Sequence, residues 1–142
     1  MQGQLFHNFI MKLTPYFGLT LVAFFMITGA NAQVLINELD PSMQGVDDRE
    51  FVELIGNPNE DLSGFIVVVF NGSNGQSNLT IDLNGYALDD AGFFLIGGPA
   101  MTDAGLVINE TNWLQVGQEA VAIFDADAAL FPDGTPVTNT DL

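Results

Sequence analysis

The sequence predicts an all-β domain, built as an antiparallel sandwich or barrel. Short β-rich runs recur at close spacing along the chain, and turns rich in glycine and asparagine separate them. No segment keeps a helical periodicity over four turns. These observations are typical of antiparallel β-sandwiches and barrels, and no linker or internal repeat divides the chain, so we expect one folded domain.

The first half of this domain contains three β-rich runs. Residues 33–38 lead into a turn-forming Asp-Pro-Ser step, and residues 49–55 end at a Gly-Asn-Pro-Asn turn. Residues 65–70, with the sequence FIVVVF, have the strongest strand character, and their unbroken apolar run predicts a strand buried on both faces. Two Asn-Gly steps follow within residues 71–75, which suits a hairpin turn.

The second half contains four more runs. Residues 78–83 alternate polar and apolar side chains, so we expect one face of this strand to meet water. An Asn-Gly step then turns the chain again. Three further apolar runs occupy residues 93–96, 106–108 and 119–124. Only residues 89–90 and 126–131 have room for a helical turn.

The first 32 residues carry the pattern of a secretory signal peptide. Lys12 precedes an uncharged apolar stretch at residues 13–30, and Ala-Asn-Ala at residues 30–32 supplies a small-x-small cleavage site. Cleavage there leaves residues 33–142 as the mature domain. The alternative is a membrane anchor, but early Thr, Pro and Gly residues shorten the run below the roughly 20 apolar residues of a span. We therefore expect secretion to the periplasm, the medium or the cell surface, with no stable membrane span after cleavage.

The charge balance excludes several classes of function. The chain has 18 acidic and 2 basic side chains and a formal net charge of −16, whereas nucleic-acid affinity comes mainly from Lys and Arg, so we expect no nucleic-acid partner. Without cysteine there are no disulfides and no thiol nucleophiles. Beyond the predicted cleavage site Arg49 is the only basic side chain, and no histidine or lysine remains. Since serine-hydrolase, aspartic-protease and P-loop signatures are also absent, we expect no catalytic residues in this chain.

Calcium is the cofactor that best suits this composition, because Ca²⁺ prefers oxygen ligands. Asp125 and Asp127, followed by Asp133, superficially resemble a calcium loop. An EF-hand would need Asp or Asn and then Gly at its fifth and sixth positions, where this sequence has Ala and Leu. A looser site at these three aspartates, or at Asp47 and Asp48, is the alternative to a solvated acidic surface that maintains solubility. We expect the solvated surface, and hence no cofactor.

Four short motifs follow one another in the first half of the domain: VLINE at 34–38, EFVEL at 50–54, NP at 57–58 and DLSGF at 61–65. In this order and spacing they resemble the lamin tail domain family, in its secreted bacterial branch, and the similarity extends to about residue 136. The positions that carry the family signature are Asn37, Glu38, Glu50, Glu53, Asn57, Leu62 and Gly64. The resemblance implies an immunoglobulin-like β-sandwich that is non-catalytic and that is often found beside secreted nucleases, phosphatases or other hydrolases.

Two departures from the family pattern affect the edges of the predicted fold. The family's Glu-Leu-Tyr-Asn-Pro turn is here Glu-Leu-Ile-Gly-Asn-Pro at residues 53–58, whose extra residue predicts a bulge or a longer turn. Family members also continue past the segment equivalent to residues 135–138 into another strand. We therefore interpret Leu142 as a fragment end, and we expect an open sheet edge with unpaired backbone groups where the last strand is missing.

Glu50 and Glu53 allow a catalytic or a structural interpretation. Paired carboxylates serve glycosidases, but residues three apart in a strand point to opposite faces, so these two should not converge on one bond. We expect instead that Asn37, Glu38 and Glu53 bind the backbone of turns at one end of the sandwich, with Arg49 as an ion partner.

The function that we expect is a secreted, non-catalytic module that attaches to a partner or positions a partner domain. Its partner is a protein or a cell-surface or matrix component. One alternative is a calcium-dependent adhesion or matrix-binding module, and a second is part of a secreted nuclease or phosphatase whose catalytic domain lies beyond this chain. Trp113 could line a carbohydrate platform with some of the phenylalanines, but at period-two spacing we expect these aromatic side chains in the core.

Overall fold

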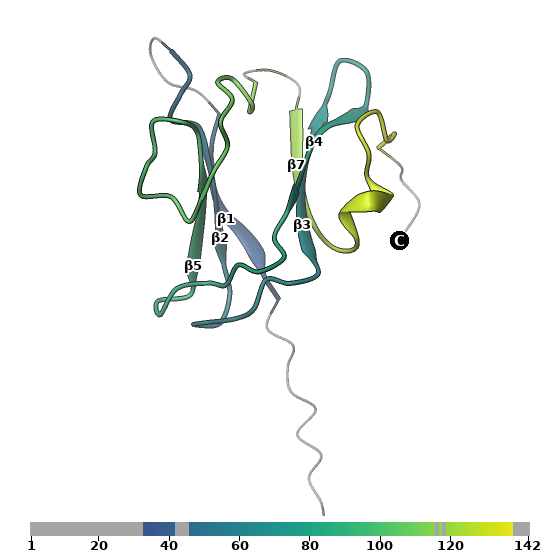
Figure 1. The fold of residues 1–142 in the computed structure, drawn as a ribbon. Coiled ribbons are helices and arrows are strands. Elements are labelled where there is room, and N and C mark those ends of the chain that lie inside the picture. The colour runs from purple at the N-terminus through teal and green to yellow at the C-terminus, as the bar shows by residue number, and fades with distance from the viewer. Residues whose placement is uncertain (1–32, 42–45, 116, 118, 138–142) are drawn as a thin grey trace, which may run out of the picture. The chain divides into compact units, whose positions relative to one another are not determined.

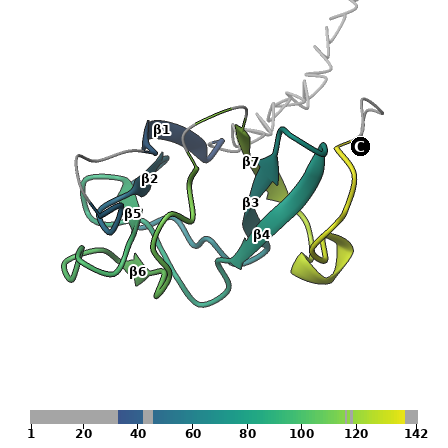
Figure 2. The same cartoon turned by 90° about the horizontal axis from the view of Figure 1, so that it is seen from above.

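The computed structural model describes residues 33–41, 46–115, 117 and 119–137, and the predicted signal peptide lies outside them. These residues form two β-sheets that pack face to face (Figure 1), which confirms the predicted β-sandwich. Seen from above, the sheets form two separate layers (Figure 2). No helix in this part of the chain is long and apolar enough to cross a membrane.

One sheet has four strands in the order β1-β2-β5-β6, and the other has three in the order β4-β3-β7. The four-stranded sheet consists of β1 (Leu35–Asp40), β2 (Phe51–Ile55), β5 (Phe93–Gly97) and β6 (Leu106–Val107). The three-stranded sheet consists of β3 (Phe65–Asn71), β4 (Gln76–Asp82) and β7 (Glu119–Asp125). All neighbouring strands are antiparallel except β5 and β6, which are parallel.

Each of the seven predicted runs forms a strand. The one helix of the described residues is the 3-10 helix η1 (Ala128–Leu130), which falls within the segment 126–131 that had room for a helical turn. Residues 89–90 form a non-helical turn instead. The Asp89 side chain stabilises this turn, because its Oδ1 accepts hydrogen bonds from the amides of Ala91 and Phe93 at 2.9 and 2.8 Å.

The core between the sheets is built from alternate residues of the facing strands. Val52 and Leu54 of β2 and Val67 and Val69 of β3 are all fully buried there. This alternation follows from the period of two with which strand side chains change faces. Trp113, from the loop before β7, is 3% exposed and joins the same core, as expected.

Strand β3 is buried on both faces, as its unbroken apolar run predicts. Ile66, Val68 and Phe70 point away from the inter-sheet core, and the chain after β7 folds back over them. Phe131 stacks on Phe124 with ring centroids 4.7 Å apart, and Phe124 packs edge-on against Phe70 at 6.5 Å. This C-terminal cover is what allows a fully apolar strand to avoid water on its outer face.

The two outer strands of the three-stranded sheet have different surroundings. Along β4, the Ser77 amide donates to the Thr135 carbonyl at 2.8 Å, and the Thr80 hydroxyl donates to the Phe131 carbonyl at 2.7 Å. Among the described residues, β7 pairs with β3 alone. The edge of the sheet at β7 is therefore open in this part of the chain.

Candidate functional site

Glu50 and Glu53 lie on opposite faces of the four-stranded sheet, as their spacing predicts. Val52 and Leu54 of β2 point into the core, so Glu50 points inward with them and Glu53 points to the outer face. Glu50 is 0% exposed, whereas Glu53 lines a pocket. The two carboxylates therefore do not act on one bond as a glycosidase pair.

Glu50 holds the loop that leads into β7. Its Oε2 accepts hydrogen bonds from the amides of Trp113 at 2.8 Å and Leu114 at 3.3 Å. The next amide along the chain, that of Gln115, donates to Oε2 of Glu119 at 3.1 Å. Two carboxylates thus bind three successive amides, which brings the Glu50 and Glu119 side chains close together.

Each of these carboxylates keeps one buried oxygen without a partner. Oε1 of Glu50 and Oε1 of Glu119 accept no hydrogen bond from the described residues. Burial raises the pKa of Glu50 above its ordinary value of 4.5; the two amide bonds oppose this rise, and the charges of Asp47 and Glu119 add to it. Burial and the neighbouring negative charges therefore make Glu50 hold its proton more tightly than an exposed glutamate does.

We expected Asn37, Glu38 and Glu53 to bind the backbone of turns, and for two of them the described residues show a different bond. The Asn37 side-chain amide instead donates to Oε1 of Glu53 at 2.6 Å. The register of β1 against β2 shifts at Asn37, and such a β-bulge re-aims the side chain, here toward Glu53. Glu38 and Arg49 are exposed to solvent. Glu50 is a signature carboxylate that does bind loop backbone.

The remaining signature positions shape the turn that follows β2. Oε2 of Glu60 accepts a hydrogen bond from the Asn57 amide at 2.9 Å, and Leu62 is fully buried. Gly64 has a φ of 91°, a conformation that favours glycine. The extra residue of this segment lies in a longer turn, since the pairing of β2 with β5 stays regular. These positions hold the fold and do not gather into a site.

The three aspartates weighed as calcium ligands are all exposed. Asp125 ends β7, and Asp127 caps η1 by accepting a hydrogen bond from the Ala129 amide at 2.9 Å. Asp133 lies beyond η1, near the end of the described chain. No three acidic, histidine or cysteine side chains of the described residues gather closely enough to hold a metal ion. Asp125, Asp127 and Asp133 are therefore not brought together as a metal site.

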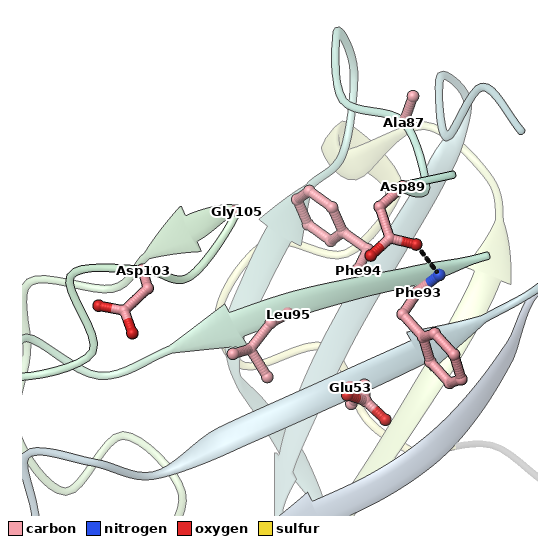
Figure 3. A pocket seen from close by; sticks show the side chains of 8 residues that line it. All are labelled: Glu53, Ala87, Asp89, Phe93, Phe94, Leu95, Asp103 and Gly105. Carbon is pink, nitrogen blue, oxygen red and sulfur yellow. Dashed lines mark hydrogen bonds between the residues drawn. The ribbon is translucent and has the colours of Figure 1, made fainter. Parts of the chain in front are cut away.

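A pocket of about 350 Å³ opens beside β5 (Figure 3). The residues that line it are Glu53, Ala87, Asp89, Phe93, Phe94, Leu95, Asp103 and Gly105. Figure 3 shows three carboxylates around the apolar side chains of β5, namely Glu53 on β2, Asp89 before β5 and Asp103 in the connection to β6. The pocket therefore combines an apolar lining with an acidic rim.

Hydrogen bonds within the protein fix the rim carboxylates. Oδ1 of Asp89 accepts from the Phe93 amide at 2.8 Å, and Oδ1 of Asp103 accepts from the Thr102 hydroxyl at 3.0 Å. Glu53 is held by the Asn37 amide already described. Such prior ordering lowers the entropy lost when a ligand binds. The lining contains no serine, threonine, cysteine, histidine or lysine, so it holds no nucleophile of these types.

Sequence reasoning missed Asp89, Asp103 and Glu119. The two aspartates carry no motif, because the pocket forms only when β2 pairs with β5 and the flanking loops meet beside that pair. For Glu119 one local signal exists, since it is the single charged residue at the start of the apolar run 119–124. Its neighbour Glu50 is distant in sequence, so their association depends on the tertiary fold.

The fold and the pocket together define a β-sandwich with an acidic, partly apolar pocket. Comparison with protein-family models, with curated proteins and with solved structures finds no match to this chain. The resemblance to the lamin tail domain family therefore stays a prediction from the sequence motifs.

Proposed function

We propose that this chain is a secreted, non-catalytic β-sandwich module of the lamin tail type, which attaches to a protein or a cell-surface component. In this proposal the acidic pocket beside β5 binds a Lys or Arg side chain of the partner. The observation that supports it is the arrangement of Glu53, Asp89 and Asp103 around an apolar lining. Attachment of this kind would also serve to position a neighbouring domain.

A long basic side chain matches both parts of the pocket. Lys and Arg bury their aliphatic stems against apolar surface and keep the charged head near polar groups. Phe93 and Leu95 supply the apolar contact, and the rim carboxylates supply charge-assisted hydrogen bonds. A volume of about 350 Å³ is at the lower end of the roughly 300–1,000 Å³ of small-molecule pockets, so it suits one side chain better than a longer ligand.

The overall charge favours the same class of partner. With 18 acidic and 2 basic side chains, the protein attracts cationic groups and repels anionic ones. Such a field mainly raises the association rate and selects against wrong partners, whereas the pocket supplies the local contacts. Together they favour a basic patch on a protein or cell surface over a nucleic acid or an acidic polysaccharide.

A calorimetric titration with a short oligolysine peptide tests this proposal. Asp103→Asn keeps the shape of the side chain and removes one rim charge, so we expect binding to weaken about fivefold, the equivalent of about 1 kcal/mol. Asp133→Asn is the matched control, because Asp133 is exposed and does not line the pocket. It makes the same change in net charge and should alter the affinity by less than about twofold.

Two results would contradict the proposal. One is equal weakening by Asp103→Asn and Asp133→Asn, which would mean that the peptide senses only the net charge. The other is the absence of measurable oligolysine binding at low ionic strength, where electrostatic attraction is strongest.

A further inference from the structure

The open edge of β7 presents backbone groups to solvent in a fixed pattern. Strands β3 and β7 pair without a register shift from Phe65 and Asp125 to Asn71 and Glu119. The Ala126 amide donates to the Gly64 carbonyl at 2.9 Å just beyond this ladder. Because hydrogen-bonded and non-bonded pairs alternate in an antiparallel ladder, every second residue of β7 turns its backbone groups away from β3.

This alternation identifies the outward-facing residues. Counting back from Ala126, residues 124, 122 and 120 direct their backbone N–H and C=O groups to β3. Val121 and Ile123 therefore direct theirs outward, where no other strand pairs with β7 among the described residues. Both Figure 1 and Figure 2 show β7 at the margin of its sheet.

Strand β7 also lacks the features that usually protect an edge strand. Such protection comes from Pro, Lys, bulges or a covering segment. The sequence of β7 is EAVAIFD, with neither Pro nor Lys, and its register with β3 has no bulge. By contrast β1, one outer strand of the other sheet, carries a bulge, β6, its second outer strand, is only two residues long, and β4 is bordered by the C-terminal segment. Within the described residues, β7 is the regular and uncovered edge.

The side chains beside this edge are apolar and incompletely covered. Val121 and Ile123 pack at the margin of the inter-sheet core and are only partly buried. An added strand next to β7 would place alternate apolar side chains over this margin.

We propose that β7 is a docking edge that takes an extended segment of another protein as a fourth strand of the β4-β3-β7 sheet, and that this segment carries Lys or Arg at the end that pairs with Asp125. The charge at this end of β7 and the net charge of the chain carry the choice of partner. Asp125 ends the strand and is exposed, so a basic residue opposite it meets an opposite charge, whereas the Glu119 carboxylate at the other end is buried and binds the Gln115 amide. The formal net charge of −16 attracts a basic segment as a whole.

A second copy of this chain is the occupant that these charges disfavour. Symmetric antiparallel pairing of two β7 strands about Ala122 would place Glu119 of each copy opposite Asp125 of the other. Like charges directly opposite each other destabilise a strand pair, and each copy carries a formal charge of −16. The edge therefore selects a different, basic-ended chain. This surface is separate from the acidic pocket beside β5, so the inference goes beyond the proposed function.

Fluorescence anisotropy with the labelled peptide Lys-Thr-Val-Thr-Val-Thr-Lys tests this inference on the purified protein, because its two Val residues pair with Ile123 and Val121 when its ends pair with Asp125 and Glu119. Val121→Pro removes an outward N–H and leaves the hydrogen bonds to β3 in place, and Pro is tolerated at such edge positions. We expect it to weaken binding at least about tenfold, whereas Val121→Ala, which keeps the N–H, should stay within about threefold. A peptide with Glu at both ends should also bind at least about tenfold more weakly.

A second measurement keeps the test decisive if Val121→Pro fails to fold. Methylating alternate backbone nitrogens of the peptide removes its donors to β7, and we expect this peptide not to bind the unaltered protein. Equal binding of the methylated and unmethylated peptides would overturn the inference. So would peptide affinity that falls with Asp103→Asn but not with Val121→Pro, because the peptide would then occupy the acidic pocket. A dimer in sedimentation that Val121→Pro abolishes would identify a second copy as the occupant and would also overturn it.

Discussion

Replacing Glu50 by Gln is expected to stabilise this protein at neutral pH, although Glu50 is fully buried and holds a loop. The change keeps the size and shape of the side chain. Its carbonyl oxygen still accepts from the amides of Trp113 and Leu114, as Oε2 of Glu50 does at 2.8 and 3.3 Å. The new NH₂ group is a donor in place of Oε1, which has no partner among the described residues.

The magnitude follows from opposing contributions. Removing an unpaired buried charge gains stability, because a buried polar group without a partner costs about 1–3 kcal/mol. Against this, the two amide bonds weaken, since bonds to a neutral oxygen are roughly half as strong as those to a charged one. We expect a net stabilisation of about 1 kcal/mol at pH 7, which for a domain of this size raises the melting temperature by about 4–8 °C.

The effect should depend on pH with a definite sign. Burial, the largest cause, raises the pKa of Glu50 above 4.5. A raised folded-state pKa means that the folded protein binds this proton more tightly, so the stability it contributes is complete below pH 4.5 and is lost as pH rises through the raised pKa. Relative to the unaltered protein, Glu50→Gln should gain little at about pH 4 and most at about pH 7.

Thermal melts followed by circular dichroism across this pH range provide the assay, with Glu50→Ala as the control. Glu50→Ala removes the acceptor of two buried amides and should destabilise at every pH, by about 2–4 kcal/mol. A difference between Glu50→Gln and the unaltered protein that does not change with pH would refute the reasoning. So would destabilisation by Glu50→Gln at pH 7 as large as that caused by Glu50→Ala.

Two further predictions concern a turn and the calcium alternative. Gly92→Ala should destabilise the protein by more than about 2 kcal/mol, because Gly92 has a φ of 89° and an added Cβ would lie 2.5 Å from the Gly56 carbonyl oxygen. Urea unfolding measures this change, and an unchanged unfolding midpoint would contradict the prediction. Replacing EDTA by Ca²⁺ should leave the melting temperature unchanged, because Asp125, Asp127 and Asp133 are exposed and not gathered. A ligand at 100 times its Kd would add about 2.7 kcal/mol, so a clear upward shift would favour the calcium-dependent module instead.

The strands could be predicted from sequence because their signals are local. The apolar run at residues 65–70 and the Asn-Gly steps after it determine strand and turn through side-chain alternation and backbone preference, without reference to distant residues. Burial of β3 on both faces was predictable too, since only cover on both sides accommodates an unbroken apolar strand. That the cover comes from Phe131 and its neighbours was not predictable, because it depends on how the chain turns after β7.

The candidate site was predictable only in part, for the same physical reason. The opposite orientation of Glu50 and Glu53 follows from the strand period alone. The bond of Glu53 to Asn37 depends on a bulge in β1, which shifts the register by one residue. Asp89 and Asp103 reach the pocket through loops on either side of β5, so no spacing in the sequence indicates their association.

The central claim, that the pocket beside β5 recognises basic side chains, is tested most directly by an amide-resolved NMR titration with the oligolysine peptide. We predict chemical-shift changes centred on Leu95, Asp103 and Gly105, which Asp103→Asn moves to about fivefold higher peptide concentration and Asp133→Asn leaves in place. Chemical-shift changes that spread evenly over the acidic surface would contradict this prediction. The absence of any change at a salt concentration near physiological strength would contradict it too.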